Sequence, residues 1–325
     1  MIWKRSFLGS DFLEKINVLV IVGPTASGKT KLAIELAKIF KGEIISADSM
    51  QIYKEMDIGT AKPTLSEMEN IPHHLIDFLD VKETFSVADY VKLAKEKIIE
   101  INQRNSLPII CGGTGLYIDS LINNINFKEE KNNFLIREKL NKIYQENGIE
   151  PLLDRLYKID KKSFEKIHKN NVKRIIRAIE FYEATGMTLS EQIENSKSKD
   201  SLYNPIFIGL DFKYRFVLYE RINNRVDKMI DMGLVNEAKK ILSKDCSKTA
   251  KSAICYKELE PYLNGDCTFN VALENLKRAT RRYAKRQLTW FRRNDRINWV
   301  FVDEYESFEK FIKKCTKHID FQKNI

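Results

Sequence analysis

Short apolar runs and amphipathic segments alternate along most of the chain. The first run, residues 17–22 (NVLVIV), ends at a glycine, and residues 31–40 then repeat apolar positions at the spacing of a helix. Further strand-like runs follow at residues 43–46, 107–111, 205–210 and 298–302. Strands that alternate with helices predict an α/β fold, in which a mostly parallel sheet carries helices on both faces.

The pattern changes between residues 123 and 204, where strand-like runs disappear and charged helical patterns replace them. This stretch ends in a polar tract, residues 194–200, with the composition of a loop. Beyond residue 210 the pattern is helical again to about residue 293. We therefore expect an α/β core with an inserted all-helical domain. The predicted divisions are an N-terminal extension (1–12), a first core part (13–122), the insertion (123–204), a second core part (205–302) and a C-terminal tail (303–325).

Composition narrows the class of protein. The 325 residues are 43% hydrophobic, enough for a large core, and no apolar run reaches the length of about 18 residues that spans a membrane. The N-terminus lacks the apolar stretch of a secretion signal, so a cytoplasmic protein is expected. Five scattered cysteines and four histidines fit a reducing compartment and no structural zinc. The net charge of +10 favours a polyanionic partner only if the basic residues cluster.

The first strand is followed by GPTASGKT, which matches the phosphate-binding P-loop pattern GxxxxGK[ST]. An apolar strand precedes the motif and an amphipathic helix follows it, so the loop amides and the helix N-terminus would converge on an anion. Lys29 would add positive charge and Thr30 could ligate magnesium. The sequence predicts that phosphate or diphosphate is bound by Gly23, Pro24, Thr25, Ala26, Ser27, Gly28, Lys29 and Thr30.

Two polar residues follow other strands and would face the same crevice, because the carboxyl ends of parallel strands share one edge of a sheet. Asp48 follows the second strand and is a candidate general base, although with Gln51 it also fits a helix-capping pattern. Thr114 lies in the GGTG turn after the strand at 107–111, where its hydroxyl could enter the crevice or belong to a plain turn. That strand ends in two glycines rather than in a Walker-B-like aspartate, which disfavours a standard nucleotide hydrolase.

Basic residues cluster in two places. In the insertion, Lys173, Arg174 and Arg177 share one face of a predicted helix. Residues 278–296 carry eight Lys or Arg against one acid, and the apolar positions 276, 283 and 290 recur every seven residues as a buried stripe. A helix with six basic side chains turned away from its core suits a phosphate backbone, although a merely solvated basic face remains the alternative.

Two other polar groups have ordinary structural interpretations. Arg221, Arg225 and Lys228 share a helix face that, taken alone, is expected to be solvated. The pair His73-His74 is expected in a packed loop rather than in a metal site.

Taken together, these motifs resemble the bacterial tRNA dimethylallyltransferase family, which prenylates adenosine 37 beside the anticodon. The resemblance runs nearly end to end and rests on several motifs in the same order. They are GPTASGKT at 23–30, ISADSMQIYKEMDIGTAKP at 45–63, IPHHLID at 71–77, FSVADY at 85–90, GGTGLYI at 112–118, NNVKRIIRAIE at 170–180, CYKEL at 255–259 and AKRQLTWFRR at 284–293.

The resemblance implies transfer of a dimethylallyl group from dimethylallyl diphosphate to N6 of adenosine 37, in tRNAs that read codons beginning with U. An exocyclic adenine amine is a poor nucleophile, so a nearby base must take its proton, and Asp48 fits that role. The P-loop, Lys29, Arg225 and a magnesium ion on Thr30 would neutralise the departing diphosphate. Thr114 would orient the amine or the diphosphate.

The resemblance also implies contacts with tRNA and a monomeric enzyme without membrane attachment. The predicted tRNA-binding residues are Asp48, Ser49, Met50, Gln51, Thr114, Arg137, Lys173, Arg174 and Arg177. One departure is Cys255, which stands where the family usually has glycine before a Tyr-Lys pair.

Other functions remain open at the level of sequence. A nucleoside or small-molecule kinase could use the same P-loop, and an isopentenyltransferase could act on free adenine nucleotides. A nucleic-acid-binding regulator could use the loop as a switch. ATP could also occupy the loop non-productively, because the amides recognise a diphosphate whatever is attached to it.

Overall fold

The computed structural model describes residues 15–125, 134–197 and 201–321. The chain divides into two compact units, of which one is Met1–Ile122 with Leu202–Ile325 and the other is Asn123–Ser201. The insertion was predicted to end at residue 204, but the next strand already begins at Tyr203, which pairs with Ile16. The predicted extension at 1–12 lies outside the described residues.

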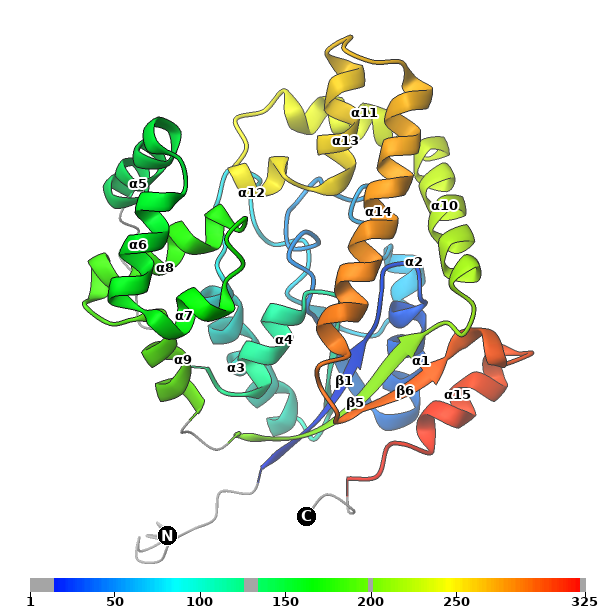
Figure 1. Cartoon of the computed structure of the whole chain (residues 1–325). Coiled ribbons are helices and arrows are strands. Elements are labelled where there is room, and N and C mark those ends of the chain that lie inside the picture. Colours follow the sequence, from blue (N-terminus) through cyan, green and yellow to red (C-terminus); the bar gives the residue numbers. More distant parts are fainter. Residues whose placement is uncertain (1–14, 126–133, 198–200, 322–325) are drawn as a thin grey trace, which may run out of the picture. The chain divides into compact units, whose positions relative to one another are not determined.

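The first unit is built on a parallel sheet of six strands (Figure 1). In chain order these are β1 (Ile16–Val22), β2 (Gly42–Ser46), β3 (His73–His74), β4 (Leu107–Cys111), β5 (Tyr203–Asp211) and β6 (Ile297–Phe301). Their order across the sheet is β3-β2-β4-β1-β5-β6, and every neighbouring pair is parallel. The predicted α/β class and its five strands are confirmed. The sixth, β3, was expected to be loop because two residues are too few for a periodic pattern.

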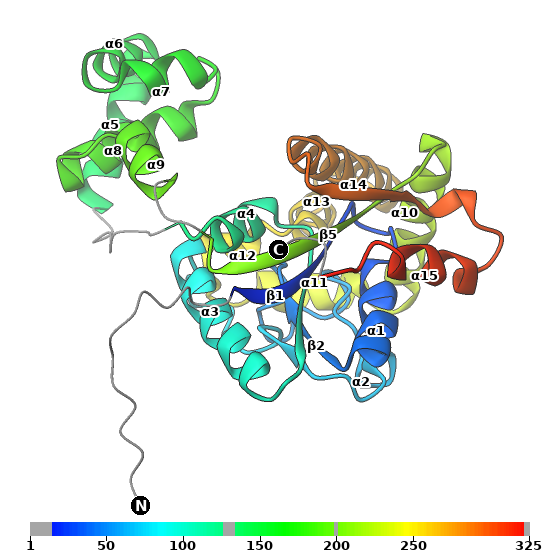
Figure 2. The ribbon, with the colours of Figure 1, turned by 90° about the horizontal axis from the view of Figure 1, so that it is seen from below.

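The helices of this unit cover both faces of the sheet. They are α1 (Lys29–Phe40), α2 (Leu65–Met68), α3 (Val87–Gln103), α4 (Gly115–Ile122), α10 (Arg215–Asp231), α11 (Leu234–Leu242), α12 (Lys248–Lys251), α13 (Ile254–Leu263), α14 (Phe269–Phe291) and α15 (Phe308–Thr316). Figure 2 shows α1 and α15 on one face of the sheet and α3 on the other. The segment predicted as a tail is therefore partly a helix. Its Phe311 and Cys315 are buried against β-strand side chains and α1, which makes α15 part of the core.

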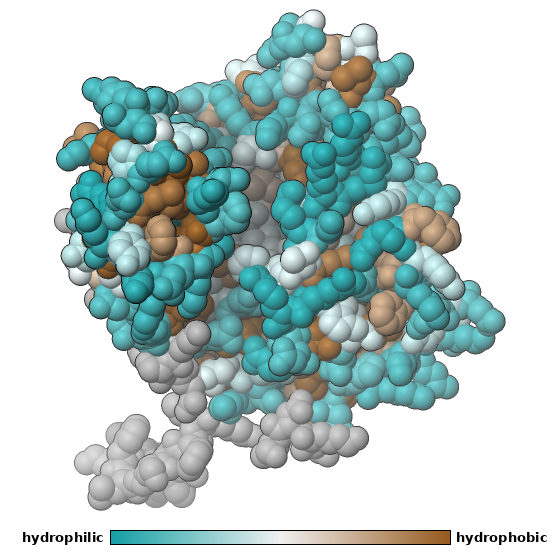
Figure 3. Space-filling view, viewed as in Figure 1, coloured by the Kyte–Doolittle hydropathy of each residue, from teal (hydrophilic) through white to brown (hydrophobic). Residues whose placement is uncertain are grey.

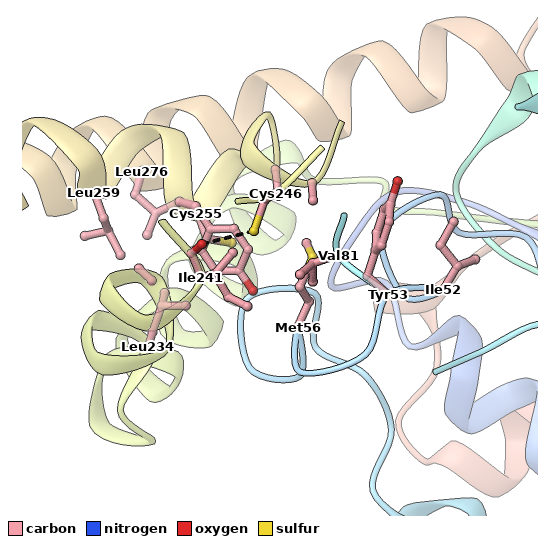
Figure 4. Close-up of a cluster of buried hydrophobic side chains, with 14 of the residues drawn as sticks. Ile52, Tyr53, Met56, Val81, Leu234, Ile241, Cys246, Cys255, Leu259 and Leu276 are labelled. Carbon is pink, nitrogen blue, oxygen red and sulfur yellow. Dashed lines mark hydrogen bonds between the residues drawn. The ribbon is translucent and has the colours of Figure 1, made fainter. Parts of the chain in front are cut away.

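A second apolar cluster fixes the segment that follows β2 (Figure 4). Ile52 and Met56 from this segment pack with Leu234 of α11, Leu259 of α13 and Leu276 of α14. All five side chains are at most 1% exposed, so the cluster removes a large apolar area from water. The chain that begins at Asp48 is thereby anchored to helices encoded some 200 residues later.

The second unit is all-helical, as the insertion was expected to be. It contains α5 (Phe134–Asn147), α6 (Glu150–Ile159), α7 (Lys161–Lys166), α8 (Val172–Thr185) and α9 (Leu189–Lys197). Leu140, Leu152, Leu156, Ile175 and Ile179 form a separate apolar core. Helix α9 extends into the tract predicted as a loop, up to Lys197. Among the described residues of both units, no helix is long and apolar enough to cross a membrane.

Candidate active site

The P-loop joins β1 to α1 and presents an open helix N-terminus. Gly28, the residue before α1, has φ +92°, a left-handed conformation that side chains rarely adopt. No side chain caps this helix, so its first N–H groups are available to an anion. The hydroxyl of Ser27 is buried and has no hydrogen-bond partner within the described residues. The loop therefore has the unsatisfied donors that a bound phosphate group would use.

Four charged or polar side chains next to this loop interact electrostatically, namely Lys29, Asp48, Cys111 and Arg225. Burial is the main cause that lowers the pKa of Lys29 to about 8; the Arg225 guanidinium contributes to this shift, whereas Cys111 and Asp48 oppose it. Burial also lowers the pKa of Arg225, again against the attraction of Asp48. The Lys29 ammonium donates to the Pro24 carbonyl at 2.7 Å. Two cations with weakened solvation and one carboxylate thus lie within electrostatic reach of each other at the carboxyl ends of β1 and β2.

The position of Arg225 corrects one prediction. The face of α10 that carries Arg221, Arg225 and Lys228 was expected to be solvated, and this is true of Lys228, which is exposed. It is not true of Arg225, which is half-buried within electrostatic reach of Lys29 and Asp48, as the role at the diphosphate implied by the resemblance requires. Arg221 turns its Nε toward the P-loop and donates to the Ala26 carbonyl at 3.0 Å. Helical periodicity locates a polar face but does not show what covers it.

Asp48 has one oxygen engaged in a turn. Its Oδ1 accepts from the backbone N–H groups of Met50 at 2.9 Å and Gln51 at 3.3 Å. No helix follows, so this is an Asx turn rather than the helix cap that the sequence allowed. Its Oδ2 accepts no hydrogen bond from the described part of the chain. The turn therefore fixes the carboxylate and leaves an acceptor for another molecule.

The rest of this segment is held by polar contacts inside the protein. The Gln51 amide donates to the carbonyls of Thr60 and Ala61, so this side chain, predicted to contact tRNA, faces its own loop. Both Glu237 oxygens accept backbone N–H groups of residues 57–59, and the Tyr256 hydroxyl donates to Oε1 at 2.9 Å. The Cys255 thiol donates to the Gly59 carbonyl at 2.7 Å. The residue that departs from the family pattern thus supports the segment rather than leaving it loose.

Thr114 lies beside Asp48 across the sheet edge. Its N–H donates to the Ala47 carbonyl at 3.0 Å, and its Oγ1 accepts from the Ser49 N–H at 3.1 Å. The turn at 112–115 is therefore joined to the segment after β2, as expected from the adjacency of β2 and β4. Burial raises the pKa of Tyr283, on α14, and hydrogen bonding to Thr114 and Gln287 opposes that shift.

Gln287 is a site residue that sequence reasoning missed. It lies on α14, is 5% exposed, and accepts from the Thr25 N–H of the P-loop at 2.8 Å. Its amide nitrogen donates to the Gly113 carbonyl at 3.1 Å. A side chain at Gly113 would put its Cβ 2.0 Å from that nitrogen and would displace the Gln287 amide. The sequence feature that could have identified Gln287 is an uncharged polar residue among the apolar positions of an otherwise basic helix.

The basic stretch at 278–296 is only partly a free surface. Helix α14 ends at Phe291, so five of the eight basic residues lie on it and three beyond it. Arg281 donates to Asn223 and Arg292 to the buried Asp211, which ties both to the core. With Lys277, helix α14 carries six basic residues, but Lys277 and Arg281 are partly buried, so fewer than the predicted six are turned to solvent. The exposed basic residues of α14 are Arg278, Arg282, Lys285 and Arg286, and the surface over α14 is mostly hydrophilic (Figure 3).

The second unit has its own basic face. Lys173 and Arg174 are exposed on α8, whose opposite side buries Ile176 and Ile179. Arg137 of α5 donates twice to one oxygen of Glu180, at 3.0 and 2.8 Å, and Arg177 donates to the same oxygen at 3.3 Å.

Glu180 is 2% exposed, whereas the side chains of Arg137 and Arg177 are 48% and 40% exposed. One buried carboxylate therefore holds two half-exposed guanidinium groups together, a charge-assisted arrangement stronger than a surface ion pair.

No cluster of three or more His, Cys, Asp or Glu side chains suited to a metal ion occurs within the described ranges. His74 hydrogen-bonds to Glu43 at 2.7 Å, and Glu43 also accepts from Arg104. His74 therefore helps to hold the edge strand β3 against β2. Asp211 ends the apolar run of β5 but is engaged by Arg292. Neither group is free to ligate a cation.

Comparisons with known proteins agree on one family. A family model described as IPP transferase matches residues 51–294. A tRNA dimethylallyltransferase of Caldanaerobacter subterraneus is 49% identical over 94% of this chain and 98% of its own.

Two solved structures are also similar. The tRNA isopentenylpyrophosphate transferase of Bacillus halodurans is 45% identical with a TM-score of 0.69, over 93% of this chain and 95% of its own. A eukaryotic dimethylallyltransferase acting on tRNA is 28% identical with a TM-score of 0.78, over 93% of this chain and 77% of its own.

Proposed function

Because the chain belongs to the IPP transferase family and prenylates adenosine 37 of tRNA, we propose that its P-loop holds the donor diphosphate while Asp48 takes the proton of the adenine amine. The observation that carries this proposal is the electrostatic contact of Lys29, Arg225 and Asp48 at one edge of the sheet. The transfer needs cations that stabilise the leaving diphosphate and a base that takes the proton of the nucleophile. Lys29 and Arg225 are the cations at this edge of the sheet, and Asp48 is the base.

On the donor side, the uncapped start of α1 and the loop amides bind the diphosphate of dimethylallyl diphosphate. Lys29 and Arg225 stabilise the negative charge that grows as the bond between carbon and the bridging oxygen breaks. The buried Ser27 hydroxyl supplies one more donor. No phosphoryl group moves, which agrees with the engagement of Asp211 by arginine and the lack of an aspartate at the end of β4.

On the acceptor side, the amine nitrogen N6 attacks the carbon from which diphosphate departs. One bond forms between nitrogen and carbon, one bond between carbon and oxygen breaks, and the nitrogen's proton passes to Oδ2 of Asp48. The Asx turn fixes the carboxylate before substrate arrives. Thr114 holds the Ser49 N–H and orients the amine from the neighbouring turn.

The residues present fit a magnesium ion on the donor. Magnesium in phosphate sites uses phosphate oxygens, water and few protein ligands. The Thr30 hydroxyl, in the first turn of α1, forms no hydrogen bond with the described residues and would be that ligand. When bound, the ion would neutralise diphosphate charge.

The tRNA must be held firmly, because adenosine 37 is stacked and its extrusion costs about a few kcal/mol. The exposed basic residues of α14 and the basic face of α8 are the surfaces with matching charge. Phosphate contacts from Lys173, Arg174 and the pair Arg137–Arg177 would offset that cost in binding energy.

The proposal is tested with Asp48→Ala and the isosteric Asp48→Asn. Purified variants are incubated with tRNA and dimethylallyl diphosphate, and the nucleosides are analysed by mass spectrometry. We expect transfer to fall by about 10²–10⁴-fold, the usual contribution of a positioned base, while tRNA affinity stays within about threefold. Full activity in both variants would refute the general-base assignment.

Asp245→Asn is the matched control, because Asp245 is an exposed aspartate outside the site. Replacing tRNA by free adenine nucleotides, and the donor by ATP, distinguishes the remaining alternatives. Prenylated free nucleotide would favour an enzyme of free adenine nucleotides, and a phosphorylated product would favour a kinase.

A further inference from the structure

Gln287 connects three elements that meet at the site and has no role in the proposed chemistry. Its carbonyl oxygen accepts from the P-loop at Thr25, and its nitrogen donates to the 112–115 turn at Gly113. The donor loop follows β1 and the turn follows β4, two neighbouring strands. The side chain that joins them comes from α14, 174 residues after the turn and 262 after the loop.

The surroundings hold Gln287 in one orientation. The side chain is 5% exposed, and both ends of its amide are used, one as acceptor and one as donor. Trp290, one turn further along α14, donates to Asp119 of α4 at 2.7 Å. Its ring packs so closely on Gly115 that a Cβ at that position would lie 2.2 Å from it. Helix α14 is thus pressed onto the turn at two successive contacts. A tilt of the helix would move the loop and the turn together.

The two elements that Gln287 joins carry opposite halves of the reaction. The P-loop holds the diphosphate, whereas the turn carries Thr114, which is bonded to the segment that begins at Asp48. Transfer requires the carbon of the donor and the nitrogen of the acceptor to meet at about 3–3.5 Å. Neither the P-loop nor the 112–115 turn fixes the distance between the two reacting atoms alone, because each belongs to the binding site of a different substrate.

We propose that Gln287 is a positioning residue that fixes the distance between the donor loop and the acceptor side of the site. The inference rests on the proposed function and assigns to it a residue that touches neither substrate. Its two hydrogen bonds bridge Thr25 and Gly113, beyond the backbone hydrogen bond from Gly112 to Ile21 that joins the turn to the end of β1. Loss of this link leaves each substrate site folded but lets the two drift relative to each other.

This role has a kinetic signature. Misplacement of reacting groups by about 1 Å costs up to about 10²-fold in rate, whereas binding of each substrate depends on contacts that Gln287 does not make. We therefore expect a lower kcat with nearly unchanged affinity for each substrate. A purely structural role would lower the melting temperature and leave kcat of the folded enzyme unchanged.

The experiment uses the full chain with Gln287→Met, which keeps the length of the side chain and removes both hydrogen bonds. Single-turnover transfer is measured with tRNA and dimethylallyl diphosphate saturating, and the Kd of each substrate is measured separately. We expect the rate to fall by about 10- to 100-fold, with each Kd within about threefold of the wild type.

Ile101→Ala is the control for stability. Ile101 lies on α3, is 0% exposed, and belongs neither to the P-loop and the 112–115 turn nor to the apolar cluster around Ile52. Both variants are assayed at a temperature where circular dichroism shows them folded. We expect Ile101→Ala to melt at a lower temperature but to keep its rate within about twofold.

Each outcome has one meaning. A rate within twofold of the wild type for Gln287→Met would overturn the inference, as would an equal loss of rate in Ile101→Ala. A Kd for either substrate raised tenfold would show that Gln287 serves binding rather than positioning, and would also overturn it. If the wild type itself adds no prenyl group to tRNA, the proposed function fails, which is a different result.

Discussion

The charges of the two units are held in opposite ways. In the first unit, Lys29, Arg225 and Asp48 are crowded at the sheet edge, and burial lowers the pKa of both cations. In the second unit, Lys173 and Arg174 stand in solvent on α8. Buried charges interact strongly at short range and resist screening, whereas exposed charges act over a Debye length of about 8 Å at physiological salt. This difference is the reason we propose chemistry for the first group and tRNA capture for the second.

The largest expected effect is on the buried group. Lys29→Met removes the cation nearest the P-loop, so we expect kcat/KM for dimethylallyl diphosphate to fall by about 10³-fold. Affinity for tRNA should stay within about threefold, because Lys29 lies among the P-loop residues and faces Pro24. Steady-state kinetics and a tRNA filter-binding assay give both numbers. A comparable loss of tRNA affinity in Lys29→Met would contradict the proposal that the buried charges serve the chemistry and the exposed charges serve tRNA binding.

The same residue predicts a pH dependence. Lys29 in the free enzyme has a pKa of about 8, below its usual value, so it is charged below pH 8 and loses its proton as the pH rises above it. Affinity for dimethylallyl diphosphate in the absence of tRNA should therefore be highest below pH 8 and decline above it. Lys29→Arg should bind with little change between pH 7 and 9. The same decline in that variant would assign the titration to another group.

The next effect tests how the second unit arranges its cations. Glu180→Gln leaves Arg137 and Arg177 beside each other without a buried carboxylate. We expect tRNA affinity to fall about tenfold because the two guanidinium groups separate, and stability to fall by about 2 kcal/mol. Donor affinity should not change. Glu191→Gln is the matched control, since Glu191 is an exposed acid on α9 that bonds to Thr188. Unchanged tRNA binding in Glu180→Gln would limit Glu180 to a structural role.

The smallest effect distinguishes the groups by salt. Lys173→Gln and Arg174→Gln should each weaken tRNA binding by about threefold at physiological salt. Each should also reduce the slope of log affinity against log salt by about 0.7–0.9, as expected for one lost phosphate contact. Lys29→Met should leave that slope unchanged. A salt titration of tRNA binding in the three variants measures this, and equal slopes in all of them would contradict the assignment of α8 to capture.

The buried charges of the first unit also show what a sequence pattern cannot predict. The helical pattern predicted that α10 has a polar face but not what lies opposite it; the resemblance, not the pattern, implied a role for Arg225 at the diphosphate, and in the structure Arg225 is partly buried. Gln51 was expected to contact tRNA, and in the structure its amide donates to the carbonyls of Thr60 and Ala61. Both outcomes depend on what lies opposite a residue, and local periodicity contains no information about that.

The sequence by itself determined the local and chemical features of this protein. GPTASGKT between a strand and a helix predicts a phosphate-binding loop, because glycine conformations and backbone amides are properties of that stretch alone. Alternating apolar runs likewise defined the parallel sheet, since burial on both faces leaves a strong local signal. The end of the insertion and the helix α15 were placed less well, because their signals are short or polar.

Only the tertiary structure decided which distant residues come into contact. Gln287 meets Thr25 across 262 residues, and Glu180 meets Arg137 across 43. Such contacts depend on the order of strands in the sheet and on how helices pack over it, and both are settled by the burial of the whole core. The P-loop pattern lies in eight consecutive residues, whereas the contacts of Gln287 with Thr25 and Gly113 depend on the whole fold.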